Sequence, residues 1–86
     1  MQLWEIEDIV RDFVVTNFLF GQPIELRPDE SLLARGIIDS TGVLEIIAFL
    51  EERYSIKVDD HDVTPVNLGS ISNISAFVGR KLERAA

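Results

Sequence analysis

Apolar residues recur every three or four positions in three segments of this chain, and this spacing constrains the fold more than any other feature. The segments run from about residue 3 to 19, from about 40 to 54 and from about 70 to 85. Side chains spaced in this way share one face of an α-helix. The sequence therefore predicts three amphipathic helices and no strands.

The apolar stripes of these helices define the expected core. They contain Leu3, Ile6, Val10, Phe13, Val14 and Phe18, then Val43, Ile46, Ile47, Leu50 and Tyr54, then Ile71, Ile74, Phe77, Val78 and Leu82. The second and third stripes are expected to meet at Ile47, Leu50, Ile74 and Phe77.

The connections between the helices differ in length and character. Gly21 and Pro23 end the first helix, and a serine, Ser70 or Ser72, is the expected N-cap of the last one. Residues 21–39 contain turn signals but carry too many apolar residues for a free linker: Ile24, Leu26, Leu32, Leu33, Ile37 and Ile38. Some of these are expected to pack across the helix ends. Asp59 to Val63 predicts one short helical turn before Pro65.

Length and composition place the whole chain, residues 1–86, in one domain held together by packing alone. A chain of 86 residues forms one small core. Because it has no cysteine, neither disulfides nor thiolate metal sites can hold it together. We expect an all-α four-helix bundle with three longer helices, a short third helix and a long loop between the first two.

A serine hydroxyl stands at the predicted start of the second helix, in the stretch Gly36-Ile37-Ile38-Asp39-Ser40-Thr41-Gly42. Unpaired N–H groups and the positive end of the helix dipole favour a phosphate at such a position. Gly42 has no side chain to block a bulky donor, and Asp39 is a suitable N-cap. On Asp39 and Ser40 alone, a simple capping pair is the better interpretation.

The wider pattern resembles the acyl and peptidyl carrier proteins. It comprises a helix, a long apolar-studded loop, Gly-x-x-Asp-Ser, an acidic helix, a short turn and a final helix. The resemblance implies 4′-phosphopantetheine attached to Ser40, with Asp39, Thr41 and Gly42 beside it. It also implies that Asp39 helps a phosphopantetheinyl transferase handle its metal and substrate. Thr41 departs from the family, which usually has leucine or methionine there.

The same resemblance implies a face of the second helix that partner enzymes contact. Thr41, Leu44 and Ala48 share its exposed stripe, and Glu45 and Glu51 flank it. Asp60 and Val63 of the following turn complete the expected partner-binding set. Between residues 39 and 62 the chain has seven acidic and two basic residues, within a net charge of −7. Such an acidic face suits basic docking partners and argues against nucleic acid or an anionic membrane surface as a partner.

Three other features of the sequence are possible sites and carry less weight. Ser40, Asp39 and His61 have the residue types of a hydrolase triad, but the surroundings of a nucleophile elbow are missing. Asp59-Asp60-His61-Asp62 has acidic ligands but lacks the glycine and final glutamate of a calcium loop, so a solvated turn is expected. Trp4 is expected to pack against the long loop, with a role as partner anchor as the alternative.

The predicted function is that of a carrier that catalyses nothing itself. It would hold an acyl or aminoacyl group as a thioester on the prosthetic thiol. Its partners would be a phosphopantetheinyl transferase, an acyl- or aminoacyl-activating ligase and a downstream acyltransferase or synthase. A D-alanyl carrier of cell-wall modification and an unmodified module with the carrier fold remain open.

Location and assembly follow from what the sequence contains. No apolar run approaches the ~20 residues of a membrane span, and Glu5, Glu7 and Asp8 stand where a signal peptide would be basic. We therefore expect a cytoplasmic monomer without membrane insertion.

Overall fold

In the computed structural model, which describes residues 2–22 and 25–85, the chain forms four α-helices and one 3-10 turn. The elements are α1 (Leu3–Phe18), α2 (Ser40–Tyr54), the 3-10 turn η1 (Asp60–Asp62), α3 (Pro65–Leu68) and α4 (Ile71–Ala85). No strand occurs in these two ranges. Pro23 and Ile24, which enter the predictions for the first loop, lie outside the described residues. The predicted all-α bundle, with three longer helices and a short third one, is confirmed.

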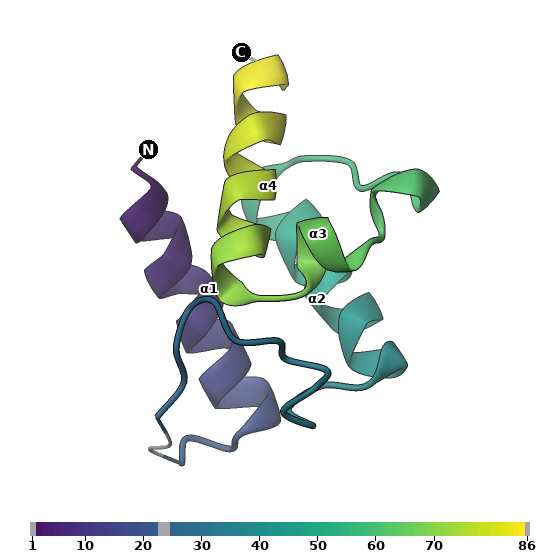
Figure 1. The fold of residues 1–86 in the computed structure, drawn as a ribbon. Helices are drawn as coiled ribbons and strands as arrows, with labels where there is room; N and C mark the ends of the chain where they lie inside the picture. Colours follow the sequence, from purple (N-terminus) through teal and green to yellow (C-terminus); the bar gives the residue numbers. More distant parts are fainter. Residues whose placement is uncertain (1, 23–24, 86) are drawn as a thin grey trace.

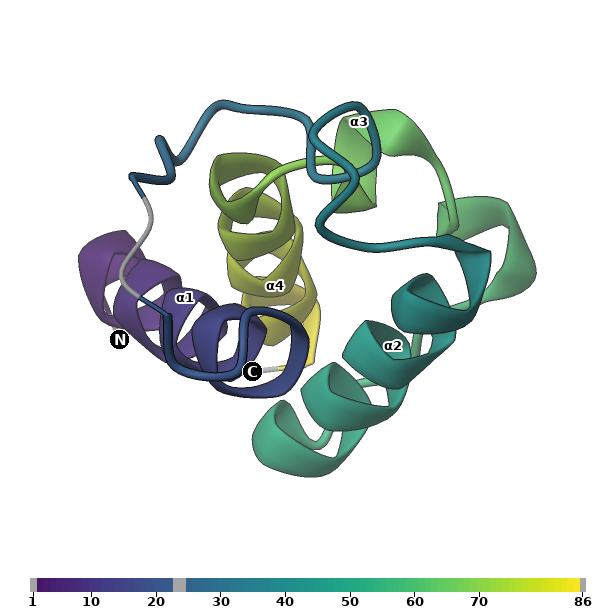
Figure 2. The same cartoon turned by 90° about the horizontal axis from the view of Figure 1, so that it is seen from below.

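The helices are arranged around α4. Figures 1 and 2 show α1 and α4 side by side and α2 on the other side of the bundle. The last helix contacts each of the other three, most extensively α1. None of the helices in the described ranges combines the length and the apolar character needed to cross a bilayer.

The core consists mainly of the predicted stripes. Its buried residues are Ile6, Val10, Val14, Leu26, Leu32, Ile38, Ile46, Leu50, Tyr54, Ile56, Leu68, Ile71, Ile74, Phe77 and Val78. Leu50, Ile74 and Phe77 are buried as expected, whereas Ile47 packs only partly buried against this cluster. Leu3 is the exception among the stripe residues, because it lies in the first turn of α1 and is half-exposed. The central part of the core prediction is therefore confirmed.

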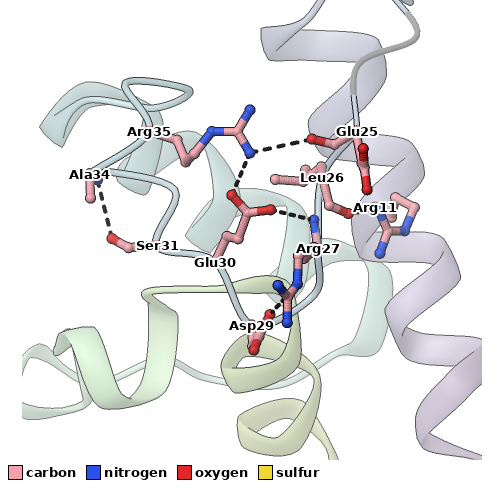
Figure 3. A network of polar contacts seen from close by, with 9 residues as sticks. All are labelled: Arg11, Glu25, Leu26, Arg27, Asp29, Glu30, Ser31, Ala34 and Arg35. Carbon is pink, nitrogen blue, oxygen red and sulfur yellow. Dashed lines mark hydrogen bonds and ion pairs between the residues drawn. The ribbon is translucent and has the colours of Figure 1, made fainter.

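Two arginines hold the long loop between α1 and α2: Arg11 of α1 and Arg35 of the loop itself. The Arg11 guanidinium donates to the Leu26 carbonyl at 2.6 Å, and Arg35 bridges the Glu25 carbonyl at 3.3 Å and the Glu30 carboxylate. Figure 3 shows these contacts from close by. The prediction that apolar loop residues pack onto the helices is confirmed for Leu26, Leu32 and Ile38, while Leu33 is exposed.

Backbone hydrogen bonds fasten the same loop to the corner between α3 and α4. The Leu32 N–H donates to the Gly69 carbonyl at 3.0 Å, and the Ser72 N–H donates to the Pro28 carbonyl at 2.9 Å. Gly36 then reverses the chain in the left-handed region, at φ 70°, where glycine has no steric penalty. This reversal directs the chain toward the start of α2.

The position of the short third helix is the main correction to the predicted elements. The expected turn at Asp59–Val63 exists as η1, but a further helical turn, α3, follows at Pro65–Leu68. Thr64 caps α3 by accepting the Asn67 N–H at 3.2 Å, and Pro65 occupies its first position, where a missing N–H costs nothing. The Thr-Pro pair was the available signal for this helix. Of the two candidate caps for α4, Ser70 accepts the Asn73 N–H at 3.1 Å.

Candidate functional site

Ser40 is exposed at the first position of α2. The preceding Asp39 is extended and its carboxylate accepts the Gly42 N–H at 2.8 Å, which confirms the predicted N-cap. The Asp39 carbonyl accepts the Val43 N–H at 3.1 Å. The first N–H groups of a helix have no intrahelical acceptor, so the hydroxyl of Ser40 lies beside free donors at the positive end of the helix dipole.

Gly42 has a different role from the one that the sequence suggested. It is buried, and a Cβ atom at this position would lie 3.1 Å from Phe18 Cε1 and 3.1 Å from Ile38 Cβ. Such separations are tighter than ordinary van der Waals contact. The residue is therefore small because α1 and the end of the loop press against the helix, and its inward position leaves the outer side of the turn to Ser40 and Thr41.

The outward face of α2 agrees with the expected partner-binding stripe. Thr41, Leu44, Glu45 and Ala48 are all exposed, and Leu44 retains 65% of its surface. Asp60 and Val63, the two predicted contacts on η1 and just after it, are exposed as well. The structure thus leaves these six residues free to contact a partner.

Apolar surface near this face was only partly predicted. Leu33 of the loop and Val66 of α3 are 49% and 76% exposed. A hollow of about 140 Å³ lies between the loop, α2 and α3, and its lining residues are Leu33, Val43, Val63, Thr64, Pro65, Leu68 and Gly69. Only some of the apolar loop residues were expected to pack across the helix ends, and no sequence signal set Leu33 apart as one that stays exposed.

Two acids of the segment expected to form the docking face, Glu51 and Asp62, are used within the fold. The Glu51 carboxylate accepts the Val58 N–H at 3.0 Å and is only partly exposed. Asp62 is buried, accepts the Asp59 N–H at 3.0 Å and lies 2.9 Å from Lys81 Nζ. The acidic segment is therefore less free than its composition indicates, and reversing Glu51 is not a neutral surface change.

The acidic turn 59–62 was expected to be solvated, and this is wrong for Asp62. Ligand-type atoms of Asp59, His61 and Asp62 lie within 4.8 Å of one another, but the Lys81 ammonium, 3.6 Å from Asp59 and 2.9 Å from Asp62, already supplies a positive charge. Its hydrogen bond is the main cause that lowers the pKa of Asp62, followed by the Asp59 N–H. The cluster therefore connects the segment around η1 to α4 through ion pairs with Lys81.

The triad interpretation finds no geometric support. The exposed His61 imidazole lies 3.6 Å from Asp62, and the Asp39 carboxylate is engaged by the Gly42 N–H. Within the described ranges, no hydrogen bond joins His61 to Ser40 or to Asp39, although a triad requires both.

Trp4 is not buried against the loop as expected, because 63% of its surface is exposed. Successive residues of an α-helix are about 100° apart, so Trp4 lies far around α1 from the buried Ile6, two positions later. The periodicity of the stripe contained this information.

The site fits the prosthetic group that the resemblance implies. A phosphodiester needs an accessible hydroxyl and a place for its charge, and exposed Ser40 with the free N–H groups of the first turn of α2 provides both. Ser40 would hold the group covalently, and the group would supply a thiol to a chain that has no cysteine.

Comparison with known proteins supports a carrier-protein family. No family model matches the sequence. The probable acyl carrier protein PigG of Serratia sp. (strain ATCC 39006) is 23% identical over 75 residues, which cover 87% of this chain and 86% of the relative. A likeness to a carrier rather than to a catalyst agrees with the expectation that the chain is not an enzyme.

A solved structure agrees in fold. A chain in the crystal structure of an FAD-dependent dehydrogenase matches with a TM-score of 0.71 and 23% identity, over 80% of this chain and 97% of that chain. At this level of identity the likeness concerns the arrangement of the helices alone.

Proposed function

We propose that the chain is a carrier protein that bears 4′-phosphopantetheine on Ser40. It holds an acyl or aminoacyl group as a thioester and shuttles that group between the enzymes of a biosynthetic pathway. The observation that carries the proposal is the exposed Ser40 hydroxyl at the capped start of a long helix, in a chain similar to an acyl carrier protein. We place this cycle in the cytoplasm, with the carrier acting as a monomer.

The modification is a phosphoryl transfer to the serine hydroxyl. The Ser40 Oγ forms a bond to the phosphorus on the pantetheine side of coenzyme A, and the bond within the pyrophosphate breaks. Adenosine 3′,5′-bisphosphate leaves, and the hydroxyl proton passes to a base of the transferase. The dipole of α2 and its free N–H groups stabilise the resulting phosphodiester, and Asp39 keeps the turn in shape.

The partners dock on the outward face of α2. Leu44 and Ala48 provide apolar contact area beside Ser40, and Glu45 provides a charge for orientation. Val63, which lines the same hollow as Val43 of α2, and the exposed Asp60 extend this surface onto the segment around η1. The expected partners are the phosphopantetheinyl transferase, an acyl- or aminoacyl-activating ligase and a downstream acyltransferase or synthase.

Incubation with coenzyme A, magnesium and a broad-specificity phosphopantetheinyl transferase tests the proposal. Intact-mass spectrometry should show the addition of one phosphopantetheine group to the chain, and Ser40→Ala should abolish it. Ser55→Gly is the matched control. Ser55 is an exposed serine at the other end of α2 with a left-handed φ of 55°, so glycine preserves the backbone there.

The result distinguishes the carrier from the module that is never modified. Modification of the wild type and of Ser55→Gly, but not of Ser40→Ala, supports the carrier. If several transferases modify a control carrier and leave the wild type unchanged, the proposal is wrong.

A further inference from the structure

We propose that Phe18, at the end of α1, is a positioning residue for Ser40. Its ring, seated against Gly42, sets the orientation in which the first turn of α2 presents the serine hydroxyl to the transferase. The inference rests on the proposed modification of Ser40, and it assigns a role to a side chain that lies on another helix.

The contact is close and leaves no free space. A Cβ atom at residue 42 would lie 3.1 Å from Phe18 Cε1 and an equal distance from Ile38 Cβ. Glycine inside a helix lowers its stability, so a glycine retained at such a buried contact indicates that the close approach of the ring needs the missing side chain. Ser40 stands two residues before this contact.

Two independent contacts therefore hold the turn that carries Ser40. On one side the Asp39 carboxylate accepts the Gly42 N–H at 2.8 Å, which fixes the backbone. On the inner side the Phe18 ring limits how close Gly42 can come to α1. The cap fixes the local geometry, and the ring fixes its placement on the rest of the protein.

The ring is itself held by aromatic neighbours. Phe18 lies edge-to-face with Phe13, at 5.9 Å between ring centroids, and Phe13 stacks on Phe49 at 4.1 Å. Phe49 belongs to the middle of α2. The aromatic cluster of Phe13, Phe18 and Phe49 thus joins α1 to α2, and Phe18 is the member whose ring lies against Gly42 in the first turn.

Two single variants disturb the contact between Phe18 and Gly42 in opposite ways. Phe18→Leu shortens the side chain that lies against Gly42, and Gly42→Ala adds a methyl group in the space next to the Phe18 ring. We expect each to lower kcat/KM for transfer of phosphopantetheine by about tenfold, within the roughly 100-fold that a 1 Å misplacement can cost. The loss should appear mainly in kcat, because the exposed residues of the docking face are unchanged.

The double variant tests whether the two residues act through one contact. Leucine at position 18 removes the Cε1 atom that the new methyl group would meet, so the loss in kcat/KM should be smaller than the product of the two single losses. Single losses that multiply in the double variant would show that Phe18 and Gly42 act separately, which would overturn the inference.

Phe49→Leu is the matched control for aromatic packing. It removes a ring from the same aromatic cluster without touching the first turn, so it should lower the free energy of unfolding while the rate of modification stays within about twofold of wild type. NMR of the unmodified chain gives a readout independent of any enzyme. The amide resonances of Ser40, Thr41 and Gly42 should shift in Phe18→Leu and remain in place in Phe49→Leu.

The outcomes separate this inference from the proposed function. A wild type that no transferase modifies would refute the carrier function itself. A wild type that is modified at the same rate as Phe18→Leu, or amide shifts in Phe49→Leu equal to those in Phe18→Leu, would refute only the positioning role.

Discussion

The Lys81 ammonium of α4 lies 2.9 Å from the carboxylate of buried Asp62 and joins the last helix to η1. The ion pair shifts both pKa values in the direction that favours the charged forms of Asp62 and Lys81. The pKa of Asp62 is lowered from its ordinary 3.8, chiefly by the hydrogen bond from Lys81, and the pKa of Lys81 is raised from 10.5 by the same bond.

The first prediction concerns pH. A carboxyl whose pKa is lowered by folding stabilises the fold above its unfolded pKa and loses this effect as pH falls through the folded value. Asp62→Asn should therefore be less stable than wild type at neutral pH, and the difference should shrink below about pH 4. Lys81 has the opposite sign, so its contribution disappears as pH rises beyond 10.5. Urea denaturation at several pH values measures both.

Asp60→Asn is the control for this experiment. Asp60 belongs to the same turn and is exposed, so removal of its charge should leave the acid limb of the stability curve close to wild type. An equal loss in Asp60→Asn and Asp62→Asn would mean that net charge, and not the ion pair with Lys81, is responsible.

The second prediction concerns the faces of the helices. Phe77 of α4 is 3% exposed, so Phe77→Ala should lower the free energy of unfolding by about 3–5 kcal/mol. Leu44, 65% exposed on α2, should change the free energy of unfolding by less than about 0.5 kcal/mol and act on partner binding instead. Chemical denaturation compares the two variants, and an equal or larger loss for Leu44→Ala would contradict the assignment of the faces.

The third prediction concerns Tyr54, whose buried hydroxyl has no hydrogen-bond partner among the described residues. An unsatisfied buried donor costs about 1–3 kcal/mol, so Tyr54→Phe should raise the free energy of unfolding by about 1 kcal/mol. Burial also raises the pKa of the Tyr54 phenol, so its ultraviolet titration should begin above the usual pH. Tyr54→Leu, which removes the ring, should destabilise the chain; a loss of stability in Tyr54→Phe would reveal a hydrogen bond in solution.

The fourth prediction concerns docking. Glu45→Lys should slow modification by the transferase at low salt by up to about tenfold, because surface charge acts on association rates. Asp8→Lys, an equal charge change on the exposed side of α1, should have a much smaller effect. Equal rates for Glu45→Lys and wild type at low ionic strength would remove Glu45 from the docking face.

The sequence predicted the elements that depend on a regular pattern. Periods of three and four residues located α1, α2 and α4. The chemistry of capping located Asp39 and Ser70, which was one of the two candidate caps of α4. The orientation of α2 also followed, since Leu44 and Ala48 are exposed as expected.

Features that depend on contacts between distant segments could not be predicted in the same way. Gly42 was attributed to the needs of an incoming donor because nothing local shows that Phe18, 24 residues earlier in the chain, lies against it. The buried state of Asp62 likewise depends on Lys81 of α4. Local signals for α3 at Thr64-Pro65 and for the exposure of Trp4 were present and were misinterpreted.

The backbone bonds from Leu32 to Gly69 and from Ser72 to Pro28 have a consequence for how the chain folds. Each closes a loop of roughly 40 residues, for which the entropy loss precedes any gain from the contact. A helical protein with such closures has a higher relative contact order than a simple bundle with short turns. Refolding should therefore be slower than the microsecond times of the simplest helical domains. The long loop loses its conformational entropy when it docks on the corner between α3 and α4.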